Sequence, residues 1–281
     1  MPVHIITDSG SDITGALSPH LTVLPLSIAF GTTTYADGVD LTHERFYQLL
    51  AERDELPTTG QVTPYAFSQA LEQVRAAGDE AVIVTLSSKL SGTYRSAVSA
   101  AADFPGAQVV DSLNATVGER ILVERALTLV DEGLSAAEIA AQLEQERSHV
   151  CLVALLDTLE YLRRGGRIPK SVGAIGELLS VKPVIGVVDG EVVMLGKARG
   201  SKNGRNLLHQ EVERSAIDFT MPVMLGYSGL SDQLLRTYLE DNRSIWEGRV
   251  REEDLPIILV GATIGTHAGP GAIVLAFFRE E

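Results

Sequence analysis

The sequence contains a single cysteine, few aromatic residues and no apolar run long enough to cross a lipid bilayer. Cys151 is the only cysteine among 281 residues, which excludes a disulfide within the chain and a metal site built from cysteines. Aromatic residues make up 5% of the chain and hydrophobic residues 45%, so the core must consist mainly of Val, Ile, Leu and Ala. The first residues, MPVHIITDSG, lack the basic and long apolar segments of a secretory signal. We therefore expect a cytoplasmic protein, with Cys151 as an inert thiol in a buried strand, VCLVALL.

Several catalytic and cofactor motifs are also missing from the sequence. It contains no G-x-x-x-x-G-K-[ST] loop, no G-x-G-x-x-G after the first predicted strand and no G-x-S-x-G. Its histidines do not pair at the spacing of metal ligands. We therefore expect neither a cofactor nor a metal.

The charge of the chain is negative but unevenly distributed. The net charge is −14 and the isoelectric point about 4.9, which disfavours general binding to nucleic acid or to anionic membranes. Between residues 160 and 205, nine Lys or Arg and four acidic residues give +5, which leaves −19 for the rest. This segment is either a solvated surface or a docking surface for an anionic partner.

The first half of the chain alternates predicted strands and helices. Thr63 and Pro64 predict a helix start, Gly78 predicts its end, and Ser135 with Glu138 forms a capping box. This alternation predicts a mostly parallel sheet covered by helices. The predicted strands or extended segments are 2–8, 21–37, 80–86 and 107–112, and the predicted helices are 63–78, 94–102 and 134–148.

The second half differs in pattern. VVDGEVV, residues 187–193, is typical of a β-hairpin, and residues 255–278 suggest two apolar strands around a Gly-rich turn. We therefore expect an α/β fold with two domains, an N-terminal α/β domain at 1–148 and a C-terminal α+β domain at 149–281.

Polar residues gather where predicted strands end. Thr7 to Ser9, Ser87 to Thr93, and Asp111 with Ser112 follow three strands, so they should meet at one edge of a parallel sheet. In the stretch LSSKLSGTYRSA, Ser91 and Gly92 stand at a predicted helix N-terminus, which favours binding of a carboxylate or phosphate. Ordinary helix capping needs only one hydroxyl and remains the alternative.

Three further segments contribute candidate residues. PTTGQVTP, residues 57–64, is a polar loop that offers Thr58, Thr59 and Gln61 as donors. GTHAGPGA, residues 265–272, places His267 in a predicted Gly-rich turn. YLRRGGRIPKS, residues 161–171, is explained in part as a basic helix C-terminus, although that explanation does not require Arg167.

Together, five motifs resemble the DegV family, the bacterial fatty-acid-binding proteins also called FakB. In order they are TDSGSD, YADG, SSKLSGTYRSA, YLRRGGRI with the following VKPVI and DG, and GTHAGPGA, and they extend from Thr7 to Ala272. The resemblance implies two α/β domains with a fatty acid between them and its acyl chain in an apolar tunnel. It also implies that Thr59, Ser91 with Gly92, and His267 bind the carboxylate.

The same resemblance implies a carrier rather than an enzyme. Such a protein presents its fatty acid to an ATP-dependent fatty acid kinase, which makes the acyl phosphate for phospholipid synthesis, and transient contact with a membrane surface would fit this role. From the charge contrast, we expect Arg167, Arg199 and Lys202 near the mouth of the site, where they serve phosphoryl transfer or kinase docking.

The chain departs from the family pattern at two positions. Gly60 replaces the usual serine of a T-S-Q loop, and Ala268 replaces the usual threonine after the histidine. A different function also stays open, because Ser91, His267 and either Asp8 or Asp111 could form an acyl-transfer triad. We favour the carrier, since a static anion site needs the same serine and no nucleophile-elbow sequence is present.

Overall fold

The structure, a computed structural model, describes residues 2–168, 181–251 and 254–280. A four-stranded sheet in the order β2-β1-β6-β7 is parallel throughout, as the alternating pattern predicted. Its strands are β1 (Val3–Asp8), β2 (Leu21–Leu24), β6 (Glu80–Thr85) and β7 (Gln108–Asp111).

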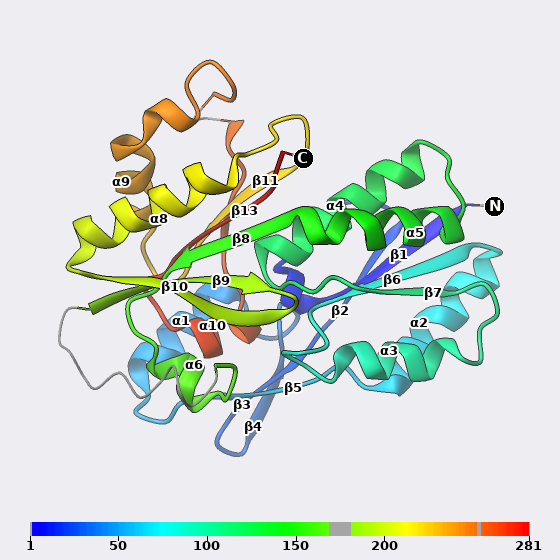
Figure 1. Ribbon diagram of the computed structural model, residues 1–281. Helices are drawn as coiled ribbons and strands as arrows, with labels where there is room; N and C mark the ends of the chain where they lie inside the picture. The colour runs from blue at the N-terminus through cyan, green and yellow to red at the C-terminus, as the bar shows by residue number, and fades with distance from the viewer. Residues whose placement is uncertain (1, 169–180, 252–253, 281) are drawn as a thin grey trace.

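Helices cover both faces of this sheet (Figure 1). Ile6 and Ile83 pack under α2 (Pro64–Ala77) and α3 (Thr93–Ala101). Ile5 and Val82 face the other way, toward α4 (Val117–Asp131) and α5 (Ala136–Glu146). The alternation of side chains along each strand thus places successive apolar residues in two separate cores.

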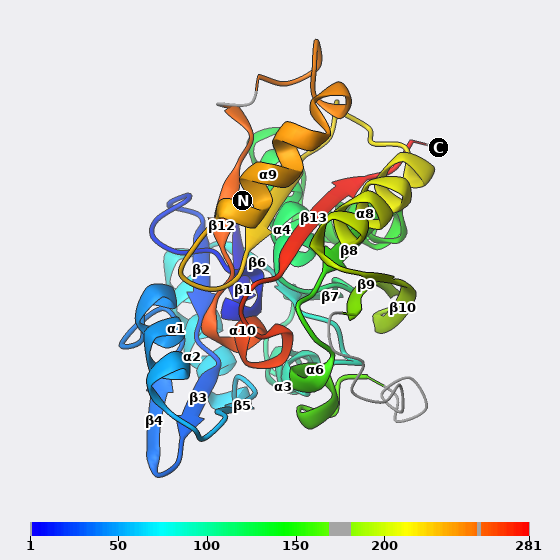
Figure 2. The same ribbon diagram turned by 90° about the vertical axis from the view of Figure 1, so that its left-hand side faces the viewer.

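A small antiparallel sheet, in the order β4-β3-β5, extends below the parallel one in both views (Figure 1 and Figure 2). Ile28 and Phe30 of this sheet pack against Phe46 of helix α1. The strand β5 pairs Thr59 with Ile28, so the segment predicted as a polar loop is partly extended chain. The elements are β3 (Ser27–Phe30), β4 (Thr33–Ala36), β5 (Thr58–Gly60) and α1 (His43–Glu52).

The second half of the chain supplies a six-stranded sheet in the order β10-β9-β8-β13-β11-β12. All neighbours in it are antiparallel except β11 and β12. Helix α4 packs on one face, and α8 and α9 pack on the other. The strands are β8 (Val150–Leu155), β9 (Val181–Val188), β10 (Glu191–Arg199), β11 (Val223–Tyr227), β12 (Ile257–Leu259) and β13 (Ile273–Phe278), and the helices are α6 (Glu160–Arg164), α8 (Ser201–Ser215), α9 (Gln233–Asp241) and α10 (Ala262–Ala268).

Short 3-10 turns complete the described elements: η1 (Ser9–Ser11), η2 (Arg147–His149) and η3 (Arg243–Ile245). None of the helices in the described ranges is both long and apolar enough to cross a membrane. The α/β class predicted from the sequence is confirmed, whereas the domain boundary near residue 149 stays a prediction.

Local sequence signals account for several element ends. Thr63 accepts a hydrogen bond from the amide of Ala66 at the start of α2, and Gly78 ends that helix with φ 81°. The capping box of Ser135 and Glu138 is present at the start of α5. Asp189 and Gly190 have φ values of 50° and 82°, the two positive values that a tight hairpin turn requires.

One prediction about the C-terminal part is wrong. His267 does not lie in a Gly-rich turn, because residues 262–268 form the helix α10 and the turn begins only at Gly269. The sequence does not predict this helix because Gly265 lies in its centre, and a glycine in a helix interior is less favourable than alanine by about 1 kcal/mol. Contacts from distant parts of the chain stabilise its first turn, as described below.

Candidate ligand-binding site

A cavity of about 410 Å³ lies between the parallel sheet and the six-stranded sheet, within the usual size range of small-molecule sites. Strands β8, β9, β10 and β13 supply much of its apolar lining, and α10 supplies another part. The aliphatic lining residues are Leu26, Leu86, Leu90, Ala115, Leu152, Ala154, Leu156, Leu162, Ile185, Val187, Val192, Val260, Ile264, Ala268, Ala272 and Val274.

The structure brings most of the predicted site residues to this cavity. Thr59, Ser91, Gly92, Arg167 and His267 all line it, although they come from four separate segments of the chain. Thr59, Ser91 and His267 are named here the hydroxyl–imidazole cluster. Because most of the other lining residues are aliphatic, a ligand that fits the cavity needs an apolar body and a small polar end.

Thr59 and His267 form the central contact of this cluster. The hydroxyl oxygen of Thr59 and Nε2 of His267 are hydrogen bonded at 3.0 Å. Burial, with a smaller contribution from the charge of Arg167, lowers the pKa of His267 to about 4, so its imidazole is neutral at pH 7.

The other ring nitrogen of His267 faces α6. Nδ1 is buried and has no hydrogen-bond partner in the described part of the chain. A Cβ added at Gly165 would overlap Nδ1, so the first glycine of the predicted RRGGR segment makes room for the ring. This gives Gly165 a role that sequence reasoning missed.

Ser91 lies in the loop between β6 and α3. Its hydroxyl lies 2.9 Å from the hydroxyl of Thr93 and accepts a hydrogen bond from the Thr93 amide at 3.2 Å. Gly92, which precedes α3, makes no side-chain cap. The hydroxyl of Ser91 therefore caps one amide at the start of α3, and Ser91 also lines the cavity.

Gly92 is explained by a neighbouring side chain. A Cβ at this position would overlap Oε1 of Gln61, whose Nε2 donates to the hydroxyl of Ser96 at 2.8 Å. The side chain of Gln61 thus connects the end of β5 to α3. It crosses the backbone at Gly92, where only a residue without a Cβ leaves enough space. The same loop contains Gly60, where a Cβ would overlap the hydroxyl oxygen of Ser27 on β3.

The three predicted basic residues lie in two different places. The guanidinium of Arg167 donates to the carbonyl oxygens of Leu90 at 3.1 Å and Gly165 at 2.6 Å, and it lines the cavity. Arg199 and Lys202 are exposed at the end of β10 and in the first turn of α8, and they do not line the cavity. Lys170, another cation of the basic segment, is outside the described residues.

The alternative triad is not assembled in this arrangement. Nε2 of His267 contacts Thr59, and no carboxylate of the described residues contacts Nδ1. Asp8 accepts instead from the amides of Gly10 and Leu86, and Asp111 from those of Ser88 and Leu113. In residues 2–168, 181–251 and 254–280, no group of three His, Cys, Asp or Glu side chains could hold a metal ion.

The model of the DegV family, described as uncharacterised proteins, matches residues 2–280. A DegV domain-containing protein of Caldanaerobacter subterraneus subsp. tengcongensis is 35% identical over 99% of each chain. The chain belongs to the DegV family.

Solved structures with the DegV fold agree with this assignment. A DegV family protein from Thermus thermophilus, described as fatty-acid binding, has a TM-score of 0.87 and 29% identity over 100% of both chains. A stearic acid-binding protein from Eubacterium ventriosum has a TM-score of 0.82 and 26% identity over 98% and 97% of the two chains. The fatty acid kinase B3 protein of Streptococcus pneumoniae, solved with linoleic acid, has a TM-score of 0.87 at 23% identity over 100% of both chains and so shows the fold.

This DegV protein also contains buried acidic residues, most of which received no role from the sequence. Asp8, Asp12, Asp37 and Glu119 are almost completely buried and are named here the buried carboxyl cluster. Burial raises the pKa of Asp8 and of Asp12 to about 7, and raises that of Glu119 well above its usual range. The motifs TDSGSD and YADG contain the three aspartates, but only the tertiary structure reveals what they contact.

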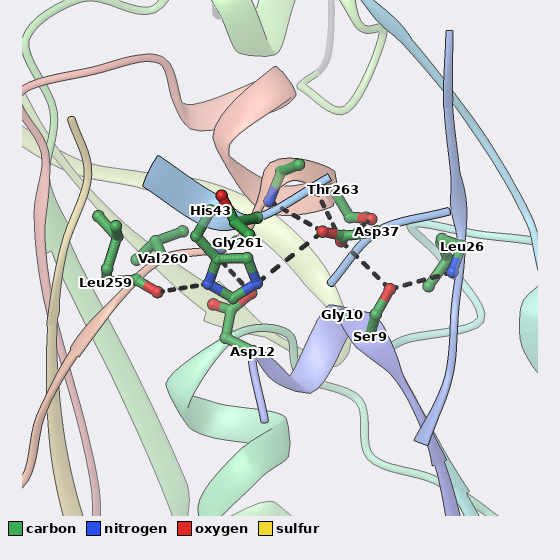
Figure 3. A network of polar contacts seen from close by, with 12 residues as sticks. Ser9, Gly10, Asp12, Leu26, Asp37, His43, Leu259, Val260, Gly261 and Thr263 are labelled. Carbon is green, nitrogen blue, oxygen red and sulfur yellow. Dashed lines mark hydrogen bonds and ion pairs between the residues drawn. The ribbon is translucent and has the colours of Figure 1, made fainter. Parts of the chain in front are cut away.

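Asp12 and Asp37, which Figure 3 shows, serve as internal acceptors. Asp37 accepts from the hydroxyls of Ser9 and Thr263 at 3.1 and 2.6 Å, and Ser9 in turn accepts from the amide of Leu26. Thr263, which donates to Asp37, lines the cavity. The buried carboxyl cluster therefore contacts a lining residue but supplies no carboxylate to the lining itself.

Proposed function

We propose that this DegV protein binds one long-chain fatty acid, with the acyl chain in the cavity and the carboxylate on the hydroxyl–imidazole cluster. The observation that carries the proposal is the combination of an aliphatic cavity of about 410 Å³ with a threonine–histidine pair and a serine at its surface. The fatty acid is a ligand and not a substrate of this chain.

The energetics favour a ligand of this kind. Each buried methylene contributes about 0.8 kcal/mol, so a long acyl chain provides most of the affinity and needs few polar contacts. The relatives from Thermus thermophilus and Eubacterium ventriosum, which are described as binding a fatty acid and stearic acid, support the same class of ligand.

The neutral imidazole has a specific role in this proposal. We propose the tautomer with its proton on Nε2, so that His267 donates to the hydroxyl oxygen of Thr59, 3.0 Å away, and the hydroxyl of Thr59 donates to a carboxylate oxygen. Ser91 donates to the same carboxylate. Hydrogen bonds to a charged group are stronger than those between neutral groups, so few donors suffice.

The basic residues act at a later step in the proposed function. The protein presents its fatty acid to a kinase, and Arg167 stabilises the negative charge of the phosphoryl group near the carboxylate. Arg199 and Lys202 dock the kinase, because both are exposed and lie in the segment of +5 net charge. The Streptococcus pneumoniae neighbour, described as a fatty acid kinase B3 protein, supports this partner.

Mass spectrometry tests the ligand directly. Protein purified from a bacterial host should carry one monocarboxylic fatty acid per chain in native spectra, and lipid extraction should release that acid chemically intact. Empty protein that also fails to bind added oleate or palmitate would contradict the proposal. Turnover of a chromogenic acyl ester that disappears in Ser91→Ala would favour the hydrolase instead.

The kinase step has its own test. The double variant Arg199→Glu and Lys202→Glu should bind palmitate like the parent chain, whereas acyl-phosphate formation with a cognate kinase should fall by about tenfold or more. Activity of the parent chain should also decrease as salt rises, since salt screens exposed charges. If the kinase forms acyl phosphate equally well with the double variant, the basic segment is a solvated surface without a role in docking.

A further inference from the structure

The connection between β12 and α10 is bound by side chains from the beginning of the chain. The carbonyl oxygen of Leu259 accepts from Nδ1 of His43 at 3.0 Å, and that of Val260 accepts from the hydroxyl of Tyr47 at 3.0 Å. Both donors belong to α1, more than 200 residues away in sequence. Distant residues therefore fix the path of the chain just before α10.

The next three residues, Gly261 and the first two residues of α10, donate to two buried carboxylates. The amide of Gly261 donates to Asp12 at 2.9 Å. The amides of Ala262 and Thr263 donate to Asp37 at 3.3 and 3.0 Å. Five consecutive residues, 259–263, thus make backbone hydrogen bonds to side chains within the first 47 residues of the chain. Figure 3 shows Leu259, Gly261 and Thr263 beside the side chains of His43, Asp12 and Asp37.

The two carboxylates are themselves held firmly. Both aspartates are 2% exposed. Asp12 also accepts from the hydroxyl of Thr116 at 2.5 Å, and Asp37 accepts from that of Ser9 at 3.1 Å. Thr116 has φ 49°, a strained value for a β-branched residue, which persists only where the surroundings enforce it. The carboxylate oxygens of Asp12 and Asp37 that accept from α10 and Gly261 are therefore held in one position.

Because His267 lies in the short helix α10, the position of its imidazole depends on the position of the first turn. The helix extends only from Ala262 to Ala268, so its first turn is more than half of its length. Thr263 and His267 are four residues apart, lie on one face of the helix, and both line the cavity. The hydroxyl of Thr263 also donates to Asp37 at 2.6 Å. A rotation of the first turn would move the imidazole away from Thr59.

We propose that Asp12 and Asp37 are positioning residues for the carboxylate site: they fix the first turn of α10 and thereby hold the imidazole of His267 against Thr59. This inference rests on the proposed function, because it assumes that the cluster binds the carboxylate of a fatty acid. Asp8 is equally buried but bonds only to Gly10 and Leu86, so burial alone does not give an aspartate this role.

The test measures preference for an acid head group at constant chain length. Dissociation constants of delipidated protein for myristate and for 1-tetradecanol give a ratio that reports the carboxylate site separately from the acyl tunnel. In Asp37→Ala, the preference for myristate should fall about tenfold or more, as when a hydrogen bond to a charged group is lost. Asp37→Asn should restore it to within about threefold, because one amide oxygen can still accept from Thr263 and Ser9.

Two further variants separate positioning from stability. Asn242→Ala removes a buried side chain that donates to the carbonyl oxygen of Tyr238 at 2.7 Å, and it should lower the melting temperature without changing the ratio. Tyr47→Phe keeps the ring and removes one of the five contacts, and it should reduce the preference by about two- to fivefold. It carries the test alone if Asp37→Ala does not fold.

The outcomes distinguish the two proposals. Wild-type protein without any preference for myristate would overturn the proposed carboxylate site, and the positioning role with it. A preference that His267→Ala abolishes but that Asp37→Ala or Tyr47→Phe leaves unchanged would overturn the positioning role alone. A reduced ratio in Asn242→Ala would also overturn it, because the ratio would then follow stability.

Discussion

The hydroxyl–imidazole cluster and the buried carboxyl cluster both contain polar side chains from distant segments, yet they differ in hydrogen bonding. Asp8, Asp12 and Asp37 accept internal hydrogen bonds on each of their carboxylate oxygens. Within the described residues, the side chains of Thr59 and His267 form a hydrogen bond with each other, and Nδ1 of His267 has no partner.

This difference indicates what marks a ligand site. Buried polar side chains alone do not, because the carboxyl cluster supplies no residue to the cavity lining and, apart from Oε2 of Glu119, its oxygens accept hydrogen bonds within the fold. Hydrogen-bonding capacity that remains available beside an apolar cavity is the more useful sign, since an incoming polar group can use it. Four predictions test this contrast.

The largest expected effect concerns stability in the carboxyl cluster. Asp8→Ala leaves the buried amides of Gly10 and Leu86 without an acceptor, and it should reduce the free energy of unfolding by about 2–6 kcal/mol. Urea unfolding of delipidated protein measures this loss, and Asp8→Asn, which keeps one oxygen, should lose less. A loss below about 1 kcal/mol in Asp8→Ala would show that the cluster is not structural.

The second prediction concerns affinity in the hydroxyl–imidazole cluster. Ser91→Ala should weaken myristate binding by about ten- to a hundredfold, because a hydrogen bond to a charged group is lost. Calorimetric titration of delipidated protein measures the change. The exposed Ser99 on α3 provides the matched control, and Ser99→Ala should bind like the parent. Unchanged affinity in both Ser91→Ala and His267→Ala would mean that the site is misplaced.

The third prediction concerns pH, where the two clusters have opposite signs. The folded pKa of Asp8 is raised from 3.8 to about 7, so its contribution to stability is present at low pH and is lost as pH rises toward 7. The folded pKa of His267 is lowered from 6.5 to about 4, so its contribution is present above pH 6.5 and is lost on acidification toward pH 4.

Unfolding measured between pH 4.5 and pH 8 separates these contributions. Asp8→Asn should remove a decrease in stability of about 2 kcal/mol between pH 5.5 and pH 7. His267→Gln should instead flatten the decrease on the acid side. If Asp8→Asn has the same pH profile as the parent, the carboxyl of Asp8 does not have a raised pKa.

The smallest expected effect concerns Gly60, beside Thr59. A serine there would place its Cβ on the hydroxyl oxygen of Ser27, so Gly60→Ser should destabilise the protein by about 1 kcal/mol. The double variant with Ser27→Ala should recover most of that loss. Full stability of Gly60→Ser alone would mean that Ser27 moves aside without cost.

The sequence alone determined the parts that depend on neighbouring residues. Alternating strand and helix patterns predicted the parallel sheet, and local signals at Thr63, Gly78, Ser135 and Asp189 marked helix ends and a hairpin turn correctly. Family motifs identified Thr59, Ser91 and His267, although their role as a carboxylate site stays a proposal. Such signals are visible because capping, turn conformation and side-chain alternation act over a few residues.

Only the tertiary structure decided where these residues meet and what supports them. No local pattern places His267 on a helix, since α10 contains a central glycine and its first turn is bound by Asp12 and Asp37. Nor does any show that Gly165 and Gly92 make room for the side chains of His267 and Gln61. These contacts join residues up to 249 positions apart, and their energies depend on burial that exists only once the sheets have packed together.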